Sequence, residues 1–101
     1  MISPQIIDQL KQIPIFQMVE RANIPITAKK ICSPITNENT PSLHLYADTN
    51  KFYDFSSETS GDVISLFMAI HTIPDFVTGC RMLAEQFNIP IPEGEGDREN
   101  D

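Results

Sequence analysis

Lysines and aromatic rings alternate through the middle of this sequence, in a combination that can hold a single strand of nucleic acid. The lysines are Lys29, Lys30 and Lys51, and the rings belong to His44, Tyr46 and Tyr53. Single strands are held where cations meet the phosphates and aromatic side chains stack on the bases. The alternative interpretation is that the lysines are solvated surface residues and the tyrosines half-buried sheet residues. The sequence leaves both interpretations open.

Three carboxylates follow at close spacing, but their positions do not predict catalysis. Asp54 ends an alternating segment, Glu58 lies in a polar loop, and Asp62 falls at a helix start, where the helix dipole favours a negative charge. No nucleophile or convergent base accompanies them, and the sequence has no phosphate-binding loop, His-Glu-x-x-His helix or nucleophile elbow. We therefore expect no catalytic site in this chain.

The net charge is unfavourable for nucleic-acid binding. More than half of the formal charge of −7 belongs to the segment 93–101, and residues 1–92 are only mildly acidic. Nucleic-acid binders usually carry a basic surface, because neutralising phosphates supplies much of their affinity. The charge therefore favours a rival function, a protein-interaction module that does not contact DNA.

Length and composition indicate one small domain. The chain has 101 residues, of which 41% are hydrophobic and 21% charged, as in an ordinary globular protein. The longest mostly apolar stretch, 63–70, is far shorter than the roughly 20 residues of a membrane span, and the N-terminus lacks the features of a signal peptide. We expect a cytoplasmic protein with no membrane contact. Its two cysteines, Cys32 and Cys80, are predicted to be buried thiols.

Helices are predicted at both ends of the chain. The pair Ser3-Pro4 predicts a capped helix through about residue 10, and apolar spacing predicts a second helix over 15–22. Two further helices are predicted, one from about residue 60 to 71 and one over 76–87.

The segment between these helices has the pattern of a β-hairpin. Residues 43–47 and 51–55 alternate between apolar and polar side chains, and Asp48-Thr49-Asn50 forms the turn. The segments 26–42 and 56–61 are rich in polar and turn-forming residues and are predicted as loops. The fold class is therefore α+β, a small antiparallel sheet flanked by N-terminal and C-terminal helices.

Four motifs occur in the order and spacing of a known domain. They are Asn37-Glu38-Asn39-Thr40-Pro41-Ser42, Lys51-Phe52-Tyr53, Gly61-Asp62-Val63-Ile64 and Met82-Leu83-Ala84-Glu85-Gln86-Phe87-Asn88-Ile89-Pro90. Over about residues 15–92 the chain resembles the N-terminal zinc-binding domain, a zinc ribbon, of bacterial-type DNA primases. The resemblance implies a zinc-ribbon-like sheet. It also implies recognition of single-stranded template DNA beside a catalytic polymerase domain, which this chain does not contain.

The zinc ligands of that family are missing here. Aligned without gaps, the family's first Cys falls on Ser33, its His on Thr36, and its third and fourth ligands on Asp54 and Ser57. Structural zinc sites need thiolates and imidazoles, so we expect neither zinc nor another cofactor.

Something must then replace the stabilising contribution of the metal. One hypothesis is a small apolar cluster of Ile31, Ile35, Phe52 and Phe55, with hydrogen bonds among the four former ligand positions. The alternative is that the tip of the ribbon is loose.

We therefore predict that residues 1–92 form a metal-free relative of the primase zinc ribbon and that 93–101 is an acidic disordered tail or linker. The predicted function is that of a non-catalytic module in DNA replication or in a mobile element. It would bind single-stranded DNA, a primase catalytic domain or a replicative helicase.

Overall fold

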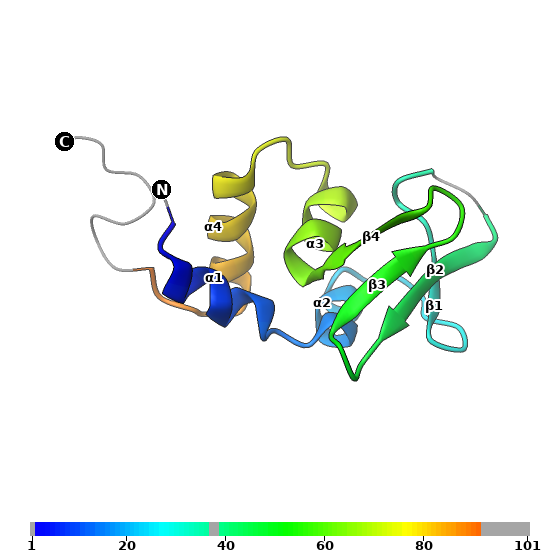
Figure 1. Ribbon diagram of the computed structural model, residues 1–101, viewed down its shortest axis with the longest axis horizontal. Helices are drawn as coiled ribbons and strands as arrows, with labels where there is room; N and C mark the ends of the chain where they lie inside the picture. The colour runs from blue at the N-terminus through cyan, green and yellow to red at the C-terminus, as the bar shows by residue number, and fades with distance from the viewer. Residues whose placement is uncertain (1, 37–38, 92–101) are drawn as a thin grey trace.

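Two short helices precede a run of four strands in the sequence, and two helices follow it. In Figure 1 the sheet lies at one end of the molecule, and α1 and α4 lie at the other. The computed structural model describes residues 2–36 and 39–91, and the predicted tail lies outside them. Within these residues the elements are α1 (Pro4–Lys11), α2 (Ile15–Arg21), β1 (Lys30–Cys32), β2 (Pro41–Tyr46), β3 (Lys51–Asp54), β4 (Thr59–Asp62), α3 (Val63–His71) and α4 (Phe76–Gln86). The predicted α+β class is confirmed.

Side-chain caps start three of the helices. The Ser3 hydroxyl accepts a hydrogen bond from the backbone N–H of Ile6 at 3.3 Å, as the sequence predicts. Asp62 and Asp75 accept from backbone N–H groups at the starts of α3 and α4, at 3.1 and 2.7 Å. Each cap satisfies a donor that the first helical turn leaves without an intrahelical partner.

The four strands form one antiparallel sheet in the order β1-β2-β3-β4. Leu45 lies opposite Phe52 and His44 opposite Tyr53, so the register of the predicted hairpin follows its alternating pattern. Leu43, Leu45 and Phe52 are buried on the inner face of the sheet. The sheet therefore has one covered face and one outer face.

Two strands lie in segments that were predicted as loops. β1 covers three residues and pairs with β2, and β4 is the polar segment Thr59-Ser60-Gly61-Asp62, paired with β3. Neither segment has the apolar alternation that marks a strand, and both become strands through pairing with the hairpin. The expected helix start at about residue 60 is also wrong, because α3 begins at Val63.

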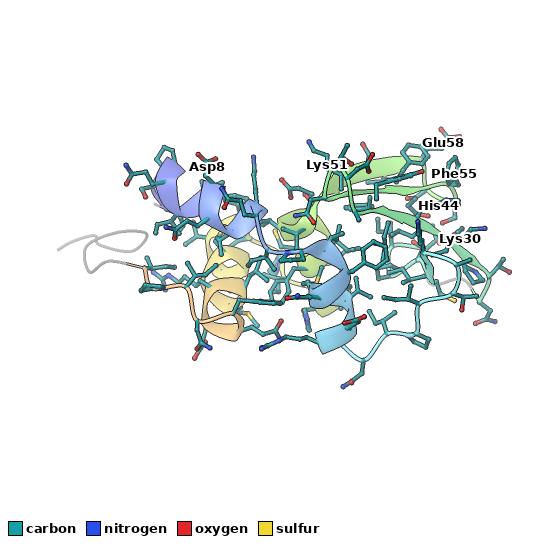
Figure 2. The ribbon with its side chains drawn as sticks, turned by 90° about the horizontal axis from the view of Figure 1, so that it is seen from below. Asp8, Lys30, His44, Lys51, Phe55 and Glu58 are labelled. Atoms are coloured by element: carbon teal, nitrogen blue, oxygen red, sulfur yellow. The ribbon has the colours of Figure 1, made fainter. Side chains whose placement is uncertain are left out.

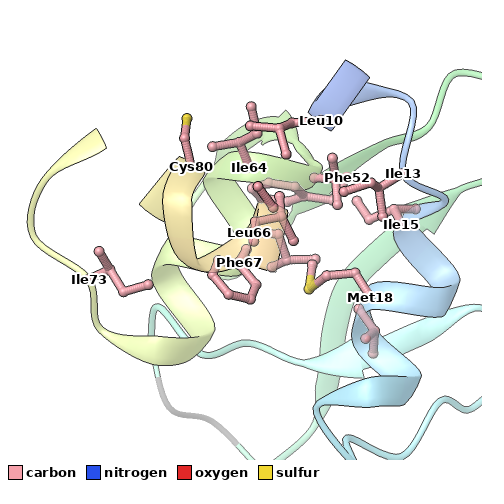
Figure 3. Packing of buried hydrophobic residues seen from close by; sticks show 14 of the residues in the cluster. Leu10, Ile13, Ile15, Met18, Phe52, Ile64, Leu66, Phe67, Ile73 and Cys80 are labelled. Carbon is pink, nitrogen blue, oxygen red and sulfur yellow. The ribbon is translucent and has the colours of Figure 1, made fainter. Parts of the chain in front are cut away.

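The core lies between the helices and the inner face of the sheet. Figure 3 shows side chains from α1, α2, β3, α3 and α4 meeting around Leu66 and Phe67 of α3. Both are buried, as is Cys80 of α4, whose pKa burial raises to about 11. Cys80 is therefore a packing residue, as predicted, whereas Cys32 is exposed, which corrects the prediction for that residue.

Of the helices in residues 2–36 and 39–91, none is alone long and apolar enough to cross a membrane. α3 and α4 together meet that test of length and composition, but they are bent by 97° to each other.

The tip of the hairpin is tied to the junction of α1 and α2 by one side chain. The Asn50 carbonyl oxygen accepts from the N–H of Ile15 at 2.8 Å, and its amide donates to the carbonyl oxygens of Lys11 and Ile13 at 2.8 Å each. Pro14, the residue before α2, provides no side-chain cap. Asn50 thus caps α2 from a distant part of the chain.

Replacing Asn50 should loosen this junction. Asn50→Gly removes the three bonds while tolerating the left-handed backbone of this position (φ 58°). We expect a loss of about 2–3 kcal/mol in the free energy of unfolding, since each bond contributes about 1 kcal/mol. Asn50→Ala should lose more, because alanine is strained at this φ. Urea unfolding measures both, with Thr49→Ala as the control. Equal stability of all three variants and the parent would contradict the assignment.

Candidate nucleic-acid interface

The outer face of the sheet carries rings and lysines on adjacent strands. His44 of β2 lies opposite Lys30 of β1 and Tyr53 of β3, and Tyr46 lies opposite Lys51. Residues directly opposite each other in a sheet point to the same face. Pairing therefore brings five of the six predicted contact residues onto one surface.

Three rings on this face touch edge to face. The Phe55 ring lies 4.6 Å from that of His44 and 4.5 Å from that of Tyr53, at interplanar angles of 67° and 68°. Tyr46 extends the row, 6.3 Å from His44 and nearly parallel to it at 26°. We call His44, Tyr46, Tyr53 and Phe55 the ring platform. Its rings leave apolar surface toward solvent, since Tyr46 is 40% and Phe55 56% exposed.

Phe55 is the ring of the platform that sequence reasoning missed. It was assigned to an apolar cluster replacing the metal, but it follows Tyr53 by two positions and so lies on the same side of an extended chain. Its N–H donates to the Ser42 carbonyl at 3.0 Å, which extends the β2–β3 pairing by one residue. The alternation of side chains along β3 was the signal that places Phe55 on the outer face of the sheet.

The lysines lie around the platform rather than on one patch. Figure 2 shows Lys30 beside His44 and Phe55, with Lys51 nearer to α1. Lys29 is exposed in the tight turn before β1, where its carbonyl accepts from Leu45 N–H at 2.9 Å. Cations thus border the rings on two sides.

Carboxylates reduce the positive potential of this surface. Asp62 lies opposite Lys51 in the β3–β4 pairing, and its side chain is 3.9 Å from the Lys11 ammonium. Glu58 is exposed on the turn after β3, close to Phe55 in Figure 2. Any contact with phosphates at this face would therefore be electrostatically weak.

A second group of polar residues joins the loop after β1 to the turn after β3. Oδ2 of Asp54 accepts from the hydroxyl of Ser33 and, at 2.8 Å, from that of Ser57. Oδ1 of Asp54 accepts from the hydroxyl of Ser56 at 2.6 Å and from its N–H at 3.0 Å. The Thr36 hydroxyl lies 2.8 Å from that of Ser56. We call these five residues the ribbon cluster.

The carboxylate at the centre of the ribbon cluster is completely buried. Burial alone would raise the pKa of Asp54, but hydrogen bonds from Ser33, Ser56 and Ser57 lower it from 3.8 to about 2. The Ser33 hydroxyl in turn accepts from the N–H groups of Ile35 and Thr36 at 3.1 and 3.2 Å. Asp54 is therefore an ionised, fully hydrogen-bonded group in the interior.

The hypothesis of an apolar cluster at the former metal site is wrong for Ile35 and Phe55. Ile31 and Phe52 are buried, but they belong to the main core. Ile35 and Phe55 are 41% and 56% exposed. Hydrogen bonds, rather than apolar packing, join the two segments here.

A match to a known protein family shows the family of this chain. The CHC2 zinc finger, the zinc ribbon of DnaG, matches this sequence over residues 2–99. The chain belongs to this family. The search of curated proteins found no match. As a CHC2 zinc finger, the chain is related to an accessory domain of DNA primase in replication, and that domain is not a catalytic one.

The residues of this CHC2 zinc finger do not suit the zinc of the family. In the ungapped alignment, the family's four ligands fall on Ser33, Thr36, Asp54 and Ser57. The hydroxyls of Ser33 and Ser57 donate to the Asp54 carboxylate, and the Thr36 hydroxyl bonds to that of Ser56. Structural zinc needs thiolates or imidazoles instead. Within the described part of the chain, no three His, Cys, Asp or Glu side chains are placed to hold a metal.

Proposed function

We propose that this domain is a non-catalytic DNA replication module that holds single-stranded DNA on the ring platform. The observation that carries the proposal is the contact of three rings, from His44, Tyr53 and Phe55, on the outer face of the sheet. Bases stack on such side chains with little dependence on sequence. The membership in the CHC2 zinc finger family supports a setting in primase-dependent replication.

Charge supports a modest role for phosphate contacts. Lys30 and Lys51 border the rings, but the formal charge of the chain is −7 and Glu58 and Asp62 lie nearby. Stacking should therefore supply most of the affinity, and salt should weaken binding only moderately. We place the domain in the cytoplasm, in replication of a bacterial-type genome or a mobile element.

Fluorescence anisotropy of a labelled single-stranded oligonucleotide tests the proposal. We expect binding at low salt, weakened several-fold by Lys30→Glu, with the difference shrinking as salt is raised. Arg81→Glu makes the same change in net charge on α4 and should have little effect. Equal effects of the two variants would show that only net charge matters. Absence of binding at low salt would remove the DNA function.

A second candidate is docking on a primase catalytic domain or a replicative helicase without DNA contact. The acidic net charge favours it, because it opposes contact with phosphates. Such a module would ignore the oligonucleotide but co-elute with a purified helicase or primase in size-exclusion chromatography. Binding of the oligonucleotide that depends on the rings would instead favour the first function.

A further inference from the structure

We propose that the ribbon cluster takes the place of the zinc ion in this CHC2 zinc finger. The Asp54 carboxylate, held by hydroxyl groups, then fixes the two segments of the ribbon to each other. The four family ligand positions converge in the structure, although none keeps a cysteine or histidine. The proposal concerns folding of the domain and does not depend on the DNA function proposed above.

The first argument is that the hydrogen bonds join the same two segments that the metal would join. A zinc ion held at these positions would tie the loop after β1 to the end of β3 and the turn that follows it. Asp54 and Ser33 form that connection here, across 21 residues of sequence, and Thr36 and Ser56 form a second one across 20. The hydrogen bonds therefore close the same loop that the metal would close.

The second argument is the polarity of the site. In a zinc site, ligand lone pairs converge on a cation. In the ribbon cluster, the hydroxyls of Ser33, Ser56 and Ser57 turn their hydrogens toward the Asp54 carboxylate. The orientation is reversed, and donors surround a central negative charge. A buried carboxylate is tolerated because its oxygens accept this many hydrogen bonds.

The third argument is the net charge of the site. The family name denotes one histidine and three cysteines, and a divalent cation bound by three thiolates carries one net negative charge. The ionised Asp54 also contributes one negative charge. The zinc site of the family and the metal-free ribbon cluster of this chain therefore carry the same formal charge.

Metal analysis and thermal unfolding of the purified full chain test the proposal directly. We expect no stoichiometric zinc, and no change of Tm after treatment with a chelator or on addition of zinc. A stoichiometric zinc ion whose removal lowers Tm would overturn the proposal.

Substitutions test whether the ribbon cluster stabilises the fold in place of the metal. Asp54→Asn should lower Tm by about 10 °C, because the serine donors lose a charged acceptor. Ser57→Ala should lower Tm by a smaller amount. This milder variant should stay folded even if Asp54→Asn does not. Ser60→Ala, an exposed serine on β4, is the matched control and should leave Tm unchanged. A Ser57→Ala variant as stable as the control would contradict the proposal.

Restoring the family ligands tests the equivalence of the two sites. The fourfold variant Ser33→Cys, Thr36→His, Asp54→Cys and Ser57→Cys should bind one Co²⁺ with the absorption spectrum of a tetrahedral thiolate site. Its folding should then depend on metal, unlike that of the parent. A folded variant that binds no Co²⁺ would show that these positions do not form a ligand set.

Discussion

Replacing Tyr53 and Phe55 together by alanine should weaken binding of single-stranded DNA by about thirtyfold or more. Stacking of a base on an aromatic side chain contributes about 1–3 kcal/mol, so losing two rings removes at least about 2 kcal/mol. The two rings touch each other at 4.5 Å, and removing both also leaves His44 without its edge contact to Phe55. Anisotropy titrations at one fixed salt concentration measure the change in Kd.

A matched control separates stacking from the loss of apolar surface. Phe76 on α4 is 46% exposed, close to the 56% of Phe55, but it belongs to the helical end of the molecule. Phe76→Ala should therefore leave the Kd unchanged. Circular dichroism confirms that each variant is folded before titration. A double variant that binds as tightly as the Phe76→Ala control would remove the ring platform from the function.

Lowering the pH from 5 to 2 should remove about 2 kcal/mol of stability that Asp54 contributes. The pKa of this carboxyl is about 2 in the folded chain against an ordinary 3.8, so unfolded chains take up protons first as the pH falls. The contribution is therefore complete above pH 3.8 and is lost progressively toward pH 2. Urea unfolding at several pH values gives the free energies.

Comparison with Asp54→Asn isolates this contribution from those of the other carboxyls. Asp75, whose pKa is also lowered by hydrogen bonds from Thr78, is retained in both proteins and cancels. Cys32, His44 and Glu58 lie on neighbouring segments, but within the described residues none forms a hydrogen bond or ion pair with Asp54. The stability difference should shrink as the pH falls. A constant difference down to pH 2 would refute the role of Asp54 as an ionised centre.

Local signals were sufficient for the helices and the hairpin. Ser3 before Pro4 marked the start of α1, and the alternation of 43–47 and 51–55 placed Leu45 and Phe52 on the inner face. These patterns depend on residues close in sequence, so the sequence alone carries them.

The elements that were missed depend on distant residues. β4 is polar throughout and becomes a strand because β3 pairs with it, and β1 is only three residues long. The exposure of Ile35 and Phe55 was also missed, because a missing zinc ion suggested an apolar substitute. The expected hydrogen bonds of Ser33 and Ser57 to Asp54 are present, but the part of Ser56 in the ribbon cluster was missed. Serines occur in any polar loop and give no distinctive pattern in one sequence.

The bonds from Asn50 link residues 35 to 39 positions apart. Such contacts form only after the intervening chain has been brought together, which slows folding relative to the local helical turns. The chain is made from its N-terminus, so α2 is synthesised before the residue that caps it. The first turn of α2 is therefore complete only once the hairpin has been made and has docked beside it.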